Sequence, residues 1–107
     1  MIALTLRDLG QLLLDDGRVA AAEELLRESV AIYRAALPAE DWRIADATSR
    51  LGSCLVAGSR YAEAEPLLLA GASGLKASRG DADRLTRAAL ERVQRLYESW
   101  QKPEEAS

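Results

Sequence analysis

The feature that most constrains this chain is an internal repeat with a period of 42 residues. When the sequence is shifted by 42 positions, residues 2–26 align with residues 44–68, and eleven of these 25 positions are identical. Average residue usage would give about two or three identities. A fixed period of this length is typical of a solenoid, in which each unit buries its apolar side against its neighbours. The identical pairs are Ile2/Ile44, Ala3/Ala45, Leu9/Leu51, Gly10/Gly52, Leu13/Leu55, Arg18/Arg60, Ala20/Ala62, Ala22/Ala64, Glu23/Glu65, Leu25/Leu67 and Leu26/Leu68.

Each unit is predicted to fold as two antiparallel helices. Apolar residues recur at steps of three and four, which is the pattern of one helix face. In the first helix these residues are Ile2, Leu6, Leu9 and Leu13. Gly17 is suited to end that helix, and the Leu37-Pro38 pair to end the second. Asp41 is a suitable N-cap for the third.

A second shift by 42 gives a weaker third copy, in which Val93 aligns with Leu9 and Leu51. We therefore predict an all-α chain of about five helices, or two and a half units. Residues 1–100 form one domain, with unit one at 1–37, unit two at 41–79 and a capping helix at 81–100. Residues 101–107 are expected to be a flexible tail or the truncated start of a next helix.

Small residues recur at one register of the repeat. Gly10 and Ala22 in the first unit are matched by Gly52 and Ala64 in the second. A glycine inside a helix costs about 1 kcal/mol relative to alanine, so its recurrence indicates a steric requirement. We expect these residues to face one another and let the two helices of each pair approach closely.

The repeat resembles the tetratricopeptide repeat in its 42-residue, kinesin-light-chain-like form. The resemblance covers most of the chain and lies in L-G-x-x-L at 9–13 and 51–55, G-R-x-x-x-A-E-x-L-L at 17–26 and S-R-Y-A-E-A-E-P-L-L at 59–68. It implies a right-handed α-solenoid of antiparallel helix pairs that serves as a protein–protein interaction scaffold. Residues 90–103 are similar to the closing repeats of arrays attached to bacterial Ser/Thr kinases. The alternative function is therefore a structural or self-association element, or the terminal part of a larger, regulatory array.

In such solenoids the first helix of each pair lines a concave groove. The resemblance places seven residues there as candidate partner-binding positions: Arg7, Gln11, Ser49, Arg50, Ser53, Arg92 and Arg95. Guanidinium groups match carboxylates in a two-pronged geometry, so an acidic peptide or protein is the expected partner. The alternative is that these are solvated charges, offset by Asp15, Glu91 and Glu98. The carboxylate clamp of the family, built around Lys and Asn at fixed positions, is not reproduced.

Residues suited to catalysis are scarce. The chain has no histidine, and its one cysteine, Cys54, takes the place of Leu12 on a side expected to face the interior. A catalytic thiol needs a base partner. No phosphate loop, dinucleotide-binding pattern or zinc spacing is present. We expect no enzyme activity, no metal and no cofactor.

Charge and hydropathy narrow the partners further. A net charge of −3 and a pI near 5.0 argue against nucleic acid as a partner. The longest apolar stretch, at 67–72, is too short to cross a bilayer, so no membrane partner is expected. A single cysteine fits a reducing cytoplasm. The first helix begins in phase at Met1 with no polar cap before it, which predicts an uncovered outer side through which copies can self-associate.

Overall fold

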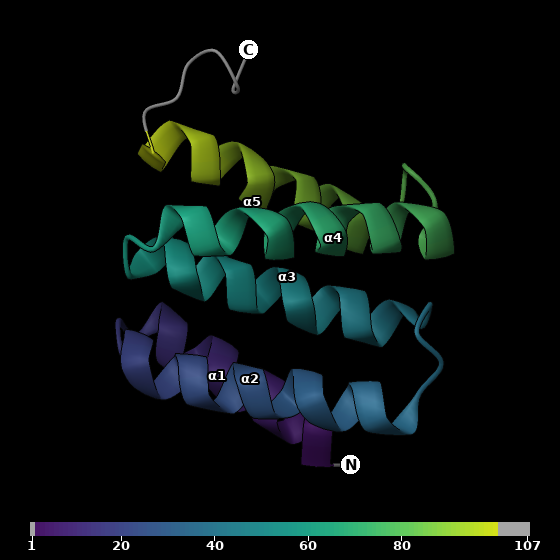
Figure 1. Ribbon diagram of the computed structural model, residues 1–107, viewed down its shortest axis with the longest axis horizontal. Coiled ribbons are helices and arrows are strands. Elements are labelled where there is room, and N and C mark those ends of the chain that lie inside the picture. The colour runs from purple at the N-terminus through teal and green to yellow at the C-terminus, as the bar shows by residue number, and fades with distance from the viewer. Residues whose placement is uncertain (1, 101–107) are drawn as a thin grey trace.

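The computed structural model describes residues 2–100, which form five helices joined by short turns (Figure 1). These are α1 (Ile2–Asp15), α2 (Val19–Ala36), α3 (Trp42–Ala57), α4 (Tyr61–Arg79) and α5 (Arg84–Trp100). The helices stack in chain order as antiparallel neighbours. The predicted tail at 101–107 lies outside the described residues.

The turns that close α1 and α3 have the same geometry, 42 residues apart. In the first turn, the Gly17 N–H donates to the Leu14 carbonyl and the Arg18 N–H donates to the Leu13 carbonyl. Gly17 has a φ of 81°, the left-handed conformation that glycine adopts without strain. The same bonds recur after α3, but there the left-handed residue is Ser59, with a φ of 63°. The turn is therefore repeated even though its glycine is not.

The other helix ends follow local sequence signals. The predicted N-cap at Asp41 is confirmed, because its carboxylate accepts the Arg43 N–H at 2.9 Å. Helix α2 ends before Leu37, whose backbone turns extended ahead of Pro38. Helix α4 ends at Gly80, which has a φ of 88°. At these three ends the capping residue itself forms a hydrogen bond to the helix.

The two helices of each pair approach closely at the repeated small residues, as predicted. A Cβ added to Gly10 would lie 2.8 Å from Cγ of Leu26, and one added to Gly52 would lie 2.6 Å from Cγ of Leu68. Both distances are shorter than real carbon–carbon contacts. The glycines therefore provide the space into which the leucine of the partner helix packs.

The helices form two layers. Helices α1, α3 and α5, the first helix of each unit, contact one another along one side, and α2 and α4 cover the other (Figure 1). One core cluster joins α1, α2 and α3 around Leu26 and Tyr33. Another joins α3, α4 and α5 around Leu68 and Leu96. The layer of first helices therefore presents one continuous side to solvent.

The predicted core stripe of α1 is wrong at two positions. Ile2 and Leu9 are exposed, whereas Ala3 and Gly10 are the buried residues of this helix. The equivalent residues of α3, Ile44 and Leu51, are buried, because α2 packs across that side. No described helix packs on the corresponding side of α1.

Candidate functional site

A groove runs along the side formed by α1, α3 and α5. It encloses about 450 Å³ between the three helices. Four of the predicted partner-binding residues line it: Gln11, Ser53, Arg92 and Arg95. The remaining lining residues include an apolar strip and two acidic side chains, which are Leu14, Val56, Ala57, Asp15 and Glu98.

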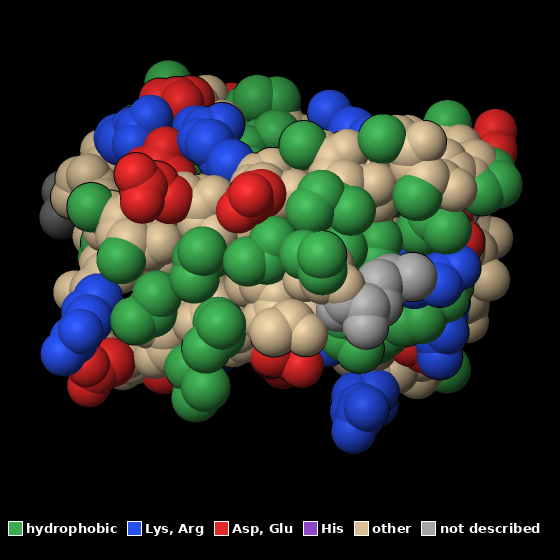
Figure 2. Space-filling model, turned by 90° about the horizontal axis from the view of Figure 1, so that it is seen from below, with side chains coloured by type: hydrophobic (Ala, Val, Ile, Leu, Met, Phe, Trp, Pro, Cys, Tyr) green, Lys and Arg blue, Asp and Glu red, His purple; other side chains and the backbone are tan. Residues whose placement is uncertain are grey.

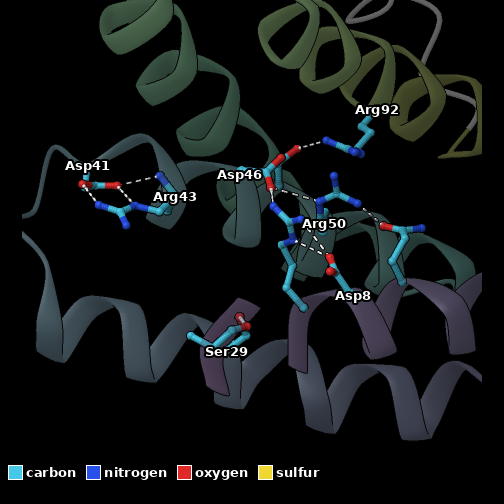
Figure 3. Close-up of polar contacts among 11 residues, drawn as sticks. Asp8, Ser29, Asp41, Arg43, Asp46, Arg50 and Arg92 are labelled. Atoms are coloured by element: carbon cyan, nitrogen blue, oxygen red, sulfur yellow. Dashed lines mark hydrogen bonds and ion pairs between the residues drawn. The ribbon is translucent and has the colours of Figure 1, made fainter. Parts of the chain in front are cut away.

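A buried carboxylate lies behind the wall of this groove. The side chain of Asp46, in α3, is fully buried. Its Oδ2 atom accepts from Arg7 of α1 at 2.8 Å and from Arg50 of α3 at 3.1 Å (Figure 3). Its Oδ1 atom is buried without a hydrogen-bond partner. A buried carboxylate is stable only when cations compensate for its lost hydration, and here two arginines do so.

Arg7 is held between two carboxylates. Its guanidinium also donates to Asp8 at 2.8 Å. Partial burial lowers the pKa of Arg7, but the hydrogen bonds and charges of Asp8 and Asp46 outweigh that effect, and the net shift is upward. Arg7 therefore points back to α3 and ties the first unit to the second.

Arg50 connects Asp46 to the groove. Besides its ion pair with Asp46, it donates to Oε1 of Gln11 at 2.9 Å, and Gln11 donates to Asp15 at 3.0 Å. The row of contacts runs from a buried acid to an exposed one across α3 and α1. It fixes the side chain of Gln11 at one edge of the groove.

Arg92, on the α5 wall of the groove, is paired with a hydroxyl and not with an acid. Its Nη1 donates to Oγ of Ser49 at 2.9 Å (Figure 3). Burial lowers its pKa, and the neighbouring charges of Arg50 and Arg95 lower it further. Within residues 2–100 neither Arg92 nor Arg95 forms an ion pair. The α5 wall of the groove thus carries cationic groups whose charge is not neutralised by a bonded acid.

The groove has no evident catalytic group. Cys54 is buried, and its thiol contacts the Val19 carbonyl oxygen at 3.4 Å. Burial raises the pKa of this thiol, which keeps it protonated and unreactive. No group of three or more His, Cys, Asp or Glu side chains that could hold a metal lies together in the part of the chain described. The chemistry that the groove supports is ion pairing and hydrogen bonding.

Residues 2–42, which span the first helix pair and the start of α3, match the tetratricopeptide repeat family. The first helix pair is thereby identified as a tetratricopeptide repeat. No curated protein matches it. Among the described helices, none is long and apolar enough to cross a membrane.

The tetratricopeptide fold extends over nearly the whole chain. A Podosopora anserina structure, "kinesin light chain nearly identical TPR-like repeats", superposes with a TM-score of 0.83 at 22% identity over 95% of this chain. This chain spans about half of that one, covering 48% of its length. The likeness confirms the predicted fold class, an α-solenoid of antiparallel helix pairs. Tetratricopeptide repeats generally mediate protein–protein interaction, and the fold is of a non-catalytic, scaffold type.

Within this tetratricopeptide fold, the predicted groove residues differ in where they lie. Ser49 is fully buried, so it acts on the groove only by orienting Arg92. Its burial depends on Gly71 of α4, where an added Cβ would lie 2.7 Å from the Ser49 Cβ. Sequence reasoning missed Asp46. The available signal was that an aspartate stands in the second unit where the first has Leu4.

Proposed function

We propose that the groove between α1, α3 and α5 binds a partner protein segment that carries carboxylates. One observation carries the proposal: Arg92 lies on the groove wall with a single hydrogen bond, to Ser49, and no ion pair within the described residues. A guanidinium has five N–H donors, so most of its hydrogen-bonding capacity is open to a ligand. Arg95 lines the same wall.

The surrounding charges favour an anion at this position. One oxygen of Asp46 accepts from both Arg7 and Arg50, and the charge of Asp46 also acts on Arg92. Three arginines therefore share one buried carboxylate. The repulsion that Arg92 experiences from Arg50 and Arg95 is relieved when an anion binds. Partial burial strengthens that attraction relative to a fully solvated ion pair.

The apolar strip of the groove favours a ligand that also carries an apolar side chain. Leu14, Val56 and Ala57 line it beside the arginines. A segment that places an apolar side chain on this strip and a carboxylate on Arg92 and Arg95 would satisfy both parts. We place this activity in the cytoplasm, since a free, buried cysteine suits a reducing compartment.

Fluorescence anisotropy with labelled peptides tests the proposal. Each acidic peptide is paired with a copy in which Glu and Asp are replaced by Gln and Asn, and with a copy carrying a C-terminal amide. We expect the acidic copy to bind more tightly and to weaken as salt rises. Arg92→Gln should weaken its binding by about 10-fold or more, because a hydrogen bond to a charged group contributes about 1.5–3 kcal/mol.

Arg87→Gln is the matched control, because Arg87 lies on α5 but outside the groove. It removes the same charge from the same helix and should leave affinity nearly unchanged at moderate salt. Equal binding of acidic and neutral peptides, or equal losses in the two variants, would refute the proposal. A peptide titration in which the NMR signals of Arg50 and Arg92 do not shift would refute it as well.

A further inference from the structure

The charged side chains that line the groove are held by neutral groups. Asp15 accepts from the side-chain amide of Gln11 at 3.0 Å. Glu98 accepts in the same way from Gln94 at 3.2 Å, and each glutamine stands four residues before its acid on the same helix. The guanidinium of Arg92 is likewise held by a serine hydroxyl. An amide or a hydroxyl orients a charged group without neutralising it, so these charges stay available to a ligand.

Several acids outside the groove are held by cations instead. Glu23 pairs with two arginines, at 2.9 and 2.6 Å, and Asp83 pairs with Arg79 at 3.1 Å. On the face in Figure 2, too, Lys and Arg side chains gather with Asp and Glu side chains. Glu98 has a similar opportunity, because Arg95 stands three residues before it, a spacing at which helix ion pairs form. Among residues 2–100, however, neither acid of the groove forms an ion pair, so the cations and the acids of the groove stay separate.

The two signs of charge also lie at different levels of the groove. Helices α1 and α3 end at equivalent positions of the repeat, and α3 and α5 begin at equivalent positions, so residues 42 apart lie at the same level. Arg92 and Arg95 form an arginine level on α5. Asp15 of α1 and Glu98 of α5 form an acid level nearer the C-terminal ends of these helices. At a rise of about 1.5 Å per residue, the acid level lies about 5–10 Å along the groove from the arginine level.

The apolar strip of the groove lies at the acid level. Leu14 and Val56 share the register of Glu98, and Ala57 shares that of Asp15. A lysine side chain fits this part of the groove, because its alkyl stem packs on apolar surface while its ammonium group stays with carboxylates and water. An acidic side chain would be repelled here, and a purely apolar one would leave both carboxylates without a cation.

We propose that the partner segment carries a lysine beside its acid, with the acid on the arginine level and the lysine on the acid level. This inference rests on the proposed function, because it adds a second contact within the same groove. In an extended segment, side chains two residues apart point to the same side and lie about 6.5 Å apart, which matches the separation of the two levels. A segment with an acid and a lysine on either side of one intervening residue therefore places both charges at once.

Fluorescence anisotropy with four labelled peptides tests this pairing. One peptide carries glutamate and lysine two residues apart, and in its copies lysine is replaced by norleucine, glutamate by glutamine, or both. Norleucine keeps the alkyl stem and removes the ammonium charge. We expect the intact peptide to bind most tightly. Glu98→Gln should weaken its binding by about 2- to 5-fold, as expected for an exposed ion pair, and should not weaken binding of the norleucine copy.

Glu91→Gln is the matched control, because Glu91 is an exposed acid of α5 that lies outside the groove. It should leave the difference between the lysine and norleucine peptides unchanged. A norleucine copy that binds the unmodified chain as tightly as the lysine peptide, or equal losses of the two peptides in Glu98→Gln, would overturn this inference. The proposed function would survive either result if Arg92→Gln still weakens both peptides. If Arg92→Gln weakens neither, the proposed function fails, and this inference fails with it.

Discussion

Asp46 and Asp8 provide a test of how burial changes the strength of an ion pair. Both carboxylates lie 2.8 Å from the guanidinium of Arg7. The side chain of Asp46 is 0% exposed and that of Asp8 is 59% exposed. The two pairs therefore share a cation and a distance and differ mainly in access to water. We predict that Asp46→Asn is far more destabilising than Asp8→Asn.

The size of the difference follows from the contacts. Asp46→Asn weakens two charge-assisted hydrogen bonds, to Arg7 and Arg50, and leaves the arginine cluster without its buried counter-charge. Breaking a buried pair costs about 3–5 kcal/mol, and the unpaired Oδ1 and partly exposed arginines place this case near the lower end, at about 3 kcal/mol. Asp8→Asn loses an exposed pair, which contributes about 0–1 kcal/mol.

Urea unfolding followed by circular dichroism measures the free energy of unfolding of both variants, and thermal unfolding measures their Tm. A loss of about 3 kcal/mol should lower the Tm of a domain of this size by more than about 10 °C, whereas Asp8→Asn should shift it by only a few degrees. The double variant Arg7→Gln with Asp46→Asn should be less destabilised than the sum of the single variants, because the two residues interact directly. Equal losses for Asp46→Asn and Asp8→Asn would refute the reasoning that burial decides the contribution.

Three further predictions follow from local geometry. Ser59→Gly should stabilise the chain by about 0.5–1 kcal/mol by removing strain at a positive φ, and Gly17→Ser should destabilise it by a similar amount; opposite signs in urea unfolding are required. The pKa of Asp41 is lowered from 3.8 to about 2 by the side chain and backbone N–H of Arg43. Its contribution to stability should be fully present above about pH 4 and lost as pH falls toward 2; an NMR titration should show this, and Arg43→Gln should move the midpoint upward. Cys54 should react with a thiol reagent only as fast as the chain opens, because burial raises its pKa and covers the sulfur; fast labelling in the native state would contradict this.

Local signals in the sequence were sufficient to predict the five helices and most of their ends. Gly17, Pro38 and Asp41 each act through the backbone of the nearest turn, so no distant residue is needed to interpret them. The repeat added the pairing of helices, because Gly10 and Gly52 share a register and face the same kind of leucine. The groove followed from the resemblance, which identifies the helices that line such a groove.

Burial could not be predicted in the same way. Ile2 and Ile44 are the same residue at the same register, yet one is exposed and the other is buried beneath α2. Asp46 and Ser49 are of polar residue types that are usually exposed, but neighbouring helices enclose both. A helix end is determined by hydrogen bonds within a few residues, so the sequence by itself determined most helix ends, although α5 begins at Arg84 and not at the predicted residue 81. Exposure depends on which other helix packs there, so only the tertiary structure decided which carboxylate is buried, which arginine keeps open donors and which face of α1 stays uncovered.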